Sequence, residues 1–316
     1  MSEAIQVAID RGLGGIVFTD HLDLGIPQGG PQFTFDVPSQ QRAVVAQIES
    51  FKEKVSDFQI LKGIEVGVDI GGRRQIKKKL RENSFDTVIA SQHLVEGFDP
   101  YFGGYYDSYD YKEAYGRYLE LFYKGIVIME DFDILGHYDY IVRYAQYPEV
   151  SITYSDFGDI LDTIFKYLIE RGKVFEINTK TYQLYRGRTP FLDIELLKRF
   201  KELGGEAISF GSDAHNVTRI AEKFEWCREV ALAAGLKYEV FFKDRKPQFI
   251  TLSFRNQYRA GVPLSIYFFF FLFSLYFFLI SFVILLVLLR YSSHCFSVRI
   301  FMYALSILFP HFSLMR

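Results

Sequence analysis

The chain has only two cysteines in 316 residues, Cys227 and Cys295. Two isolated cysteines make no disulfide framework, so we expect a reducing, cytoplasmic location. Neither cysteine is placed like a nucleophile beside a base. The first residues include acids and hold no uninterrupted apolar run, so we expect no secretory signal peptide there.

Two binding signatures are also missing. The glycine-rich stretches 12–15 and 103–104 lack the strand-loop-helix context of a phosphate-binding loop. The chain has no basic stripe, and its formal net charge is −2. We therefore expect no nucleic-acid partner.

Residues 253–316 differ in composition from the rest of the chain. They hold five arginines and no acidic residue, and positions 260–289 are thirty consecutive uncharged residues. Such a run is long enough to cross a bilayer once, so one interpretation is a transmembrane helix over 262–289 that anchors the protein in a membrane. The other, which we favour, is a mistranslated extension, because Phe, Leu, Ser, Ile, Tyr, Val and Cys are the residues that thymine-rich codons specify.

Residues 1–252 have the pattern of an α/β domain. Removing the tail's five arginines from 36 Lys+Arg leaves 31 against 38 Asp+Glu, a net charge near −7. Short apolar runs alternate with amphipathic stretches, which indicates βα units around a parallel sheet. The runs predict strands near 15–18, 59–64, 86–90, 132–135, 174–177 and 207–210, and a further extended segment at 247–252. The amphipathic stretches predict helices over 2–12, 39–55, 73–82, 110–129, 155–171, 190–203 and 216–234.

Histidines and carboxylates follow the ends of these apolar runs. All four histidines before residue 253 stand there, with one Glu and one Asp in equivalent places. Because the carboxyl ends of parallel strands share one edge, these side chains can meet around a metal cluster. Ligands from many different strands favour a sheet closed into a barrel, with its site at the carboxyl face. The residues are His21, Glu65, His93, His137, Asp213 and His215.

The ordered set of motifs resembles the polymerase-and-histidinol-phosphatase (PHP) family, and within it the histidinol-phosphate phosphatases. The motifs are Thr19-Asp20-His21, Glu65, Ser91-Gln92-His93, Gly136-His137 and Gly211-Ser212-Asp213-Ala214-His215, together with the aromatic stretch 105–120 and the run 175–179. The resemblance covers residues 1 to about 252. It implies a distorted (β/α)7 TIM-like barrel of the PHP type and hydrolysis of the small phosphate ester L-histidinol phosphate in histidine biosynthesis.

The resemblance also implies a set of two or three divalent metal ions. Zinc, manganese and iron all suit the ligands, and the sequence does not choose among them. Glu65 would bridge two metals: one that it shares with His93 and His137, and one that it shares with Asp213. A third metal would use His21 and His215. Asp213 and His215 could also relay a proton to the leaving group.

One part of the family pattern has no match in this sequence. The family opens with a strand that carries His-x-His, followed shortly by another His, whereas this chain opens in a helix that ends at Gly12. We therefore expect a barrel that lacks its first strand. We also expect the chain to hydrolyse histidinol phosphate at least roughly a hundredfold more slowly than a version extended by that strand, because three imidazole ligands are missing.

Some roles stay open. Arg186 and Arg188 could fork a substrate phosphate, or belong to a solvated basic loop. The aromatic stretch 105–120 could close over a cationic substrate, although a helix packed through its tyrosines is the better interpretation. Two other functions are alternatives: a PHP-type phosphoesterase acting on phosphotyrosine or nucleotides, and an inactive, membrane-tethered PHP-like protein.

Overall fold

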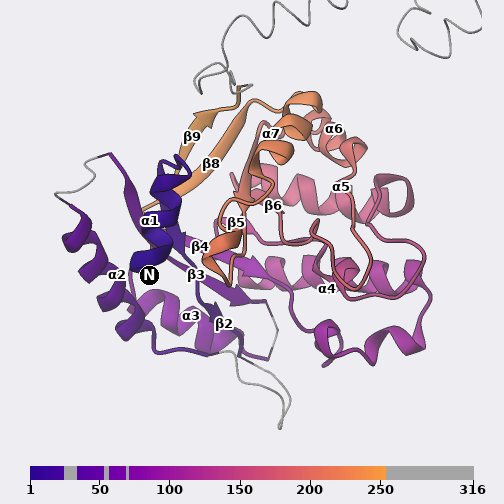
Figure 1. Cartoon of the computed structure of the whole chain (residues 1–316). Coiled ribbons are helices and arrows are strands. Elements are labelled where there is room, and N and C mark those ends of the chain that lie inside the picture. The colour runs from indigo at the N-terminus through magenta and orange to yellow at the C-terminus, as the bar shows by residue number, and fades with distance from the viewer. Residues whose placement is uncertain (25–33, 53–56, 69–70, 254–316) are drawn as a thin grey trace, which may run out of the picture. The chain divides into compact units, whose positions relative to one another are not determined.

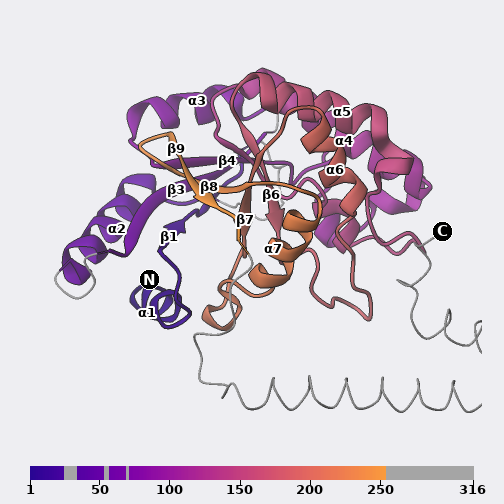
Figure 2. The ribbon, with the colours of Figure 1, turned by 90° about the horizontal axis from the view of Figure 1, so that it is seen from above.

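The computed structural model describes residues 1–24, 34–52, 57–68 and 71–253 (Figure 1). These residues form a curved sheet with helices packed on its outer side (Figure 2). The strands are β1 (Gly15–Phe18), β2 (His21–Leu22), β3 (Gln59–Gly67), β4 (Thr87–Ser91), β5 (Ile134–Leu135), β6 (Val174–Asn178), β7 (Ala207–Gly211), β8 (Tyr238–Lys243) and β9 (Lys246–Thr251). The α-helices are α1 (Ser2–Asp10), α2 (Val37–Phe51), α3 (Arg73–Glu82), α4 (Tyr111–Met129), α5 (Tyr154–Glu170), α6 (Ile194–Glu202) and α7 (Phe224–Ala233).

The strand order is β1-β3-β4-β5-β6-β7-β8-β9, and β2 pairs with β3 beyond the end of β1. Among the strands that the structure describes, every pair from β1 to β8 is parallel, and β8 and β9 form an antiparallel hairpin. Parallel neighbours need long crossovers, which the helices supply, and a parallel sheet is covered on its faces. This explains why β4 and β6 are buried along their whole length. The predicted α/β class with a parallel sheet is confirmed.

The sheet is curved so strongly that β4 and β8 contact each other. Thr87 Oγ1 at the start of β4 donates to the carbonyl of Phe242 in β8 at 3.0 Å. On the other side, Arg11 donates to the carbonyls of Ile220 and Thr218, which ties the end of α1 to the loop after β7. Within the described residues β1 pairs with β3 on one side only. The predicted closed barrel therefore stays a prediction, as does a missing first strand.

The aromatic stretch 105–120 is part of the core. Tyr105, Tyr115 and Tyr118 are fully buried in the main hydrophobic cluster, with α4 lying on the sheet. The Tyr118 hydroxyl donates to the carbonyl of His137 at 3.3 Å. The interpretation of a helix packed through its tyrosines fits this burial, because rings buried to this degree cannot close over a ligand.

Three elements, one helix and the strands β2 and β8, differ from the predicted ones. The helix expected over 216–234 is replaced up to residue 223 by a short 3₁₀ turn, Val217–Arg219, because the Asn216 side chain accepts the Thr218 N–H and caps that turn instead. Lys223 has a φ of 64°, so α7 begins only at Phe224. Strand β8 was not predicted, since its alternation is masked by the charged residues at its ends.

Within the described part of the chain, no helix is both long and apolar enough to cross a bilayer. The predicted transmembrane or mistranslated segment, 253–316, lies almost wholly outside the described residues.

A buried ion pair fixes the turn between β8 and β9 against the sheet. Arg245 Nε lies 2.6 Å from Asp133 Oδ2, which also accepts the Val88 N–H at 2.8 Å. Arg245→Met would leave a buried carboxylate unpaired. We expect a loss of about 2 kcal/mol in the free energy of unfolding, less than for a fully buried pair because the Arg245 side chain is 31% exposed. Urea denaturation measures this loss. Lys237→Met, which breaks the exposed pair with Glu206, is the control and should leave the free energy of unfolding unchanged.

A second pair, between α5 and α6, predicts a pH dependence. Arg199 binds both oxygens of Asp162, at 3.0 and 2.6 Å. These hydrogen bonds lower the pKa of the Asp162 carboxyl below its ordinary value. The pair therefore stabilises the fold above the ordinary carboxyl pKa, and its contribution is lost as the pH falls through the lowered pKa. Arg199→Met should lower the free energy of unfolding at pH 7, and this loss should shrink as the pH falls through the lowered pKa of Asp162. An equal loss at every pH would contradict an electrostatic origin.

Candidate metal centre

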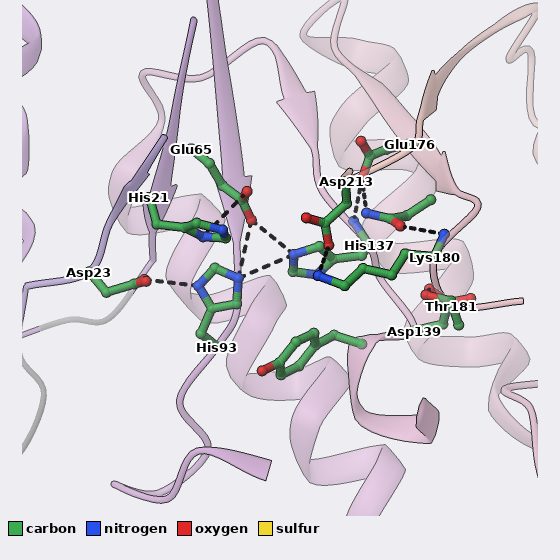
Figure 3. Close-up of polar contacts among 12 residues, drawn as sticks. His21, Asp23, Glu65, His93, His137, Asp139, Glu176, Lys180, Thr181 and Asp213 are labelled. Atoms are coloured by element: carbon green, nitrogen blue, oxygen red, sulfur yellow. Dashed lines mark hydrogen bonds and ion pairs between the residues drawn. The ribbon is translucent and has the colours of Figure 1, made fainter. Parts of the chain in front are cut away.

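The six residues predicted as metal ligands meet at one edge of the sheet. His21 opens β2 directly opposite Glu65 of β3 in the parallel register. The other four side chains follow β4, β5 and β7 within a few residues. Parallel strands place all their carboxyl ends at this edge, which brings together residues that are far apart in the sequence (Figure 3). The side chains therefore lie close together as expected, and their role as metal ligands stays a prediction.

The tightest group consists of Glu65, His93 and His137. Glu65 Oε1 lies 2.9 Å from His137 Nε2 and 3.1 Å from His93 Nε2, and the two imidazole nitrogens are 3.2 Å apart. Ligands about 2.0–2.1 Å from a zinc-like cation stand about 3.0–3.4 Å from one another. The three atoms therefore have nearly the spacing of one face of a coordination polyhedron. This donor set fits a divalent cation.

Two further groups share residues with the first. His21, Asp213 and His215 present ligand atoms within 4.8 Å of one another, as do His21, Asp23 and His93. His21 Nδ1 also lies 3.5 Å from Glu65 Oε2, so both oxygens of that carboxylate face imidazoles. His21 thereby connects the buried group to the more exposed pair Asp213 and His215.

The charges at this edge depend on one another. Burial opposes ionisation of Glu65, but the nearby imidazoles of His21, His137 and His93 outweigh it and hold its pKa well below the ordinary value. For His93 burial acts against the charged form, yet Asp23 and Glu65 raise its pKa well above the usual range. The site thus keeps its carboxylate ionised because basic nitrogens surround it.

Sequence reasoning missed the residues that hold the ligands. Asp23 Oδ1 lies 2.9 Å from His93 Nδ1, on the side of the ring away from Glu65. Lys180 Nζ lies 2.9 Å from Asp213 Oδ2 and 3.3 Å from His215 Nδ1. Asp23 follows His21 by two residues, so its alternation along the strand was an available signal. Nothing in the local sequence marks Lys180, because its partners come from another strand.

Glu176 holds the backbone of His137 in place. Its Oε2 accepts the backbone N–H of His137 and the side-chain amide of Asn178, both at 3.1 Å. Burial raises the pKa of this carboxyl to about 7. Gly211, on the neighbouring strand, leaves the space for it, since a Cβ there would overlap the Glu176 carboxylate. Two residues on, Asp213 has a φ of 43°, an uncommon conformation for a side chain other than glycine.

Arg186 and Arg188 line a cavity of about 280 Å³ beside the site. Arg188 donates to the carbonyls of Ala145 and Tyr147, so its guanidinium braces the cavity wall. Arg186 lies 5.2 Å from the centre of the Tyr185 ring. Both arginines line the same cavity, and their predicted role toward a substrate phosphate stays a prediction.

Comparisons with known proteins agree with this geometry. The sequence pattern of the PHP domain matches residues 1–180. The chain belongs to the PHP family. It is 33% identical over 247 residues to a protein from Clostridium acetobutylicum named a probable histidinol-phosphatase, covering 78% of this chain and 91% of that protein. It is 32% identical over 243 residues to the histidinol-phosphatase of Lactococcus lactis, covering 77% of this chain and 88% of that protein.

A solved structure also superposes on this member of the PHP family. The crystal structure is that of histidinol phosphate phosphatase from Lactococcus lactis, complexed with zinc, L-histidinol and phosphate. It matches with a TM-score of 0.69 and 30% sequence identity, covering 78% of this chain and 91% of that one.

The close approach at Gly211 gives a testable prediction. Gly211→Ala should displace Glu176 from the His137 amide, cost about 1–3 kcal/mol in unfolding free energy and lower the metal content per chain. Gly14→Ala is the matched control, because nothing lies within 4 Å of the Cβ added there. Urea denaturation and elemental analysis of the purified variants measure both effects. If the two alanine variants have the same unfolding free energy and the same metal content, the present position of Glu176 is not required for either.

Proposed function

We propose that this chain is a metal-dependent phosphomonoesterase that hydrolyses L-histidinol phosphate to L-histidinol and phosphate. The observation that supports it best is the buried group of Glu65, His93 and His137, whose ligand atoms lie 2.9–3.2 Å apart. Membership of the PHP family and the names of the relatives point to the same reaction. The Lactococcus structure with zinc, L-histidinol and phosphate supplies the substrate class. A cytoplasmic location belongs to the proposal, since Cys227 is free and buried.

In this proposal the metal ligands are the six residues that converge at the carboxyl edge. Glu65 would serve two metal positions, one together with His93 and His137 and one with Asp213, and His21 and His215 would hold a third ion. Zinc, manganese and iron remain candidates, with two or three ions bound. When bound, such divalent cations supply Lewis-acid activation of water and neutralise charge on the phosphoryl oxygens.

Other side chains orient the ligands, bind the phosphate and supply a proton. Asp23 holds the His93 ring by its Nδ1, and Glu176 holds the backbone of His137, so the imidazoles keep one orientation. Lys180 places an ammonium group beside Asp213, where it can also bind a phosphoryl oxygen. His215 is the most exposed of the ligands, at the rim where a leaving alkoxide would need a proton. Arg186 would approach the phosphate from the cavity beside the site.

Glu65→Gln tests the ligand role. The change keeps the size of the side chain but removes the charge that two metal positions share. We expect the metal content to fall by at least one ion per chain and kcat/KM for L-histidinol phosphate to fall roughly a hundredfold or more. Glu120→Gln, on the exposed face of α4, is the control and should change neither quantity. An unchanged metal content in Glu65→Gln would remove Glu65 from the ligand set.

The substrate is tested by comparing three phosphate monoesters on the same purified chain. L-histidinol phosphate should be hydrolysed with a kcat/KM at least tenfold above that for phosphotyrosine and for a nucleoside monophosphate. The reverse order would keep the phosphoesterase chemistry and replace the substrate. Loss of all three activities after chelation, with recovery on adding zinc or manganese, would establish the metal requirement.

A further inference from the structure

The candidate metal centre lies across a boundary between two parts of the fold, residues 11–22 and the loop 212–223, which we call the seam. His21 follows β1, whereas Asp213 and His215 follow β7. The three residues nevertheless present ligand atoms within 4.8 Å of one another, and the two imidazole rings are 5.6 Å apart. Among the described residues β1 pairs with β3 only, so no direct strand pairing there joins the two sides of this ligand group.

The guanidinium group of Arg11 crosses the seam. Arg11 directly follows α1, and it donates to the carbonyl of Thr218 at 2.7 Å and to the carbonyl of Ile220. In the described part of the chain these are the only hydrogen bonds between residues 1–22 and the loop 212–223. Hydrogen bonds from a charged donor are stronger than those between neutral groups. Arg11 therefore connects the two sides of the ligand group where the sheet does not.

The loop 212–223 needs contacts from outside itself to keep its conformation. Its regular structure is limited to the short 3₁₀ turn Val217–Arg219. Asp213, Ala221 and Lys223 have φ values of 43°, 55° and 64°, a region that side chains other than glycine rarely adopt. Residues in this region keep their conformation only where the surrounding structure holds them. The position of the ligands on this loop therefore depends on the groups that bind the loop from either side.

On the side away from the seam, the loop is bound to the connection that follows β6. Arg219 donates to the side-chain oxygen of Gln183, and Lys223 Nζ donates to the carbonyl of Tyr182. The loop is thus hydrogen bonded on one side to the β6 connection and on the other side to Arg11. Without the Arg11 guanidinium the loop would stay attached to the β6 connection, while its distance from β1 and β2 would no longer be fixed by a hydrogen bond.

We propose that Arg11 is a positioning residue for the metal centre: by holding the loop after β7, it sets the distance between His21 and the pair Asp213 and His215. A cation binds tightly only where its ligands are held to within a fraction of an ångström. A residue that orients ligands without touching the ion commonly changes metal affinity ten- to hundredfold. This inference rests on the proposed function, because it takes the converging residues as metal ligands.

The other ligand group should not depend on Arg11. Glu65, His93 and His137 come from β3 and from the segments that follow β4 and β5, and these three strands pair with one another in sequence. Their ligand atoms already lie 2.9–3.2 Å apart without a contact from the loop 212–223. Loss of Arg11 should therefore weaken one metal position and leave another unchanged.

Arg11→Met tests the proposal, because methionine keeps much of the apolar stem and removes the guanidinium group. Zinc binding to the metal-free full chain is measured by calorimetry. We expect the most weakly bound ion to lose about ten- to hundredfold in affinity and the most tightly bound ion to stay within about twofold. Arg11→Lys keeps the charge without the two-pronged geometry, so its loss should be smaller, and it supplies the test if Arg11→Met does not fold. Gln6→Met breaks a hydrogen bond to Asp10 within α1 and is the control, with parent-like binding.

A double-mutant cycle separates positioning from a general loss of structure. In a His215→Ala background the seam has already lost a ligand, so Arg11→Met should cause little further loss of zinc affinity. The same loss in both backgrounds would overturn the proposal, as would equal weakening of all ions or unchanged binding in Arg11→Met. In those cases the proposed function stands if the parent chain binds at least two zinc ions and hydrolyses L-histidinol phosphate. A parent chain that binds fewer than two ions overturns the proposed ligand set and this inference together.

Discussion

The site depends on a single buried carboxylate surrounded by imidazoles. Glu65 would be costly to bury as an ion by itself, but both its oxygens face ring nitrogens, at 2.9 and 3.1 Å for Oε1 and 3.5 Å for Oε2. This keeps its pKa well below the ordinary value even though it is buried. Its neighbours His21, His93 and His137 come from three separate βα units. Their meeting requires parallel strands in register, so the fold and the site share one constraint.

Around this carboxylate, most polar side chains serve to fix other side chains. Asp23 fixes the orientation of the His93 ring through its Nδ1. Glu176 lies in the space beside Gly211 and accepts the backbone N–H of His137. A coordination site needs its ligands held to within a fraction of an ångström, and packed buried partners provide that stiffness. Lys180 differs from these, because its ammonium group points at ligands and is partly open to solvent. Buried residues thus hold the ligands in place, and partly exposed residues such as Lys180 are the ones that a substrate could contact.

The charged side chains around the metal centre are unevenly distributed, with arginines on one side and Asp99 on the other, and tyrosine rings lie between them. Arginines without acidic partners in the described structure gather around the cavity beside Tyr144, while Asp99 offers a free oxygen on the other side of that ring. Fixed charges of opposite sign on either side of a site orient a substrate that itself has two charges. In the proposed reaction the metal centre takes the phosphate. The tyrosine rings between them meet in edge-on contacts.

The sequence by itself determined the α/β class, most of the strands and the six residues that meet at the edge. It could do so because strand ends are marked locally, and because all carboxyl ends of a parallel sheet share one side. It did not predict β8 or the late start of α7, where the Asn216 cap overrode the helical pattern. It also missed Asp23 and Lys180, which contact the predicted ligands. Only the tertiary structure showed these contacts, because the partners, His93 for Asp23 and Asp213 for Lys180, lie on other strands; the alternation of Asp23 with His21 was the one local signal.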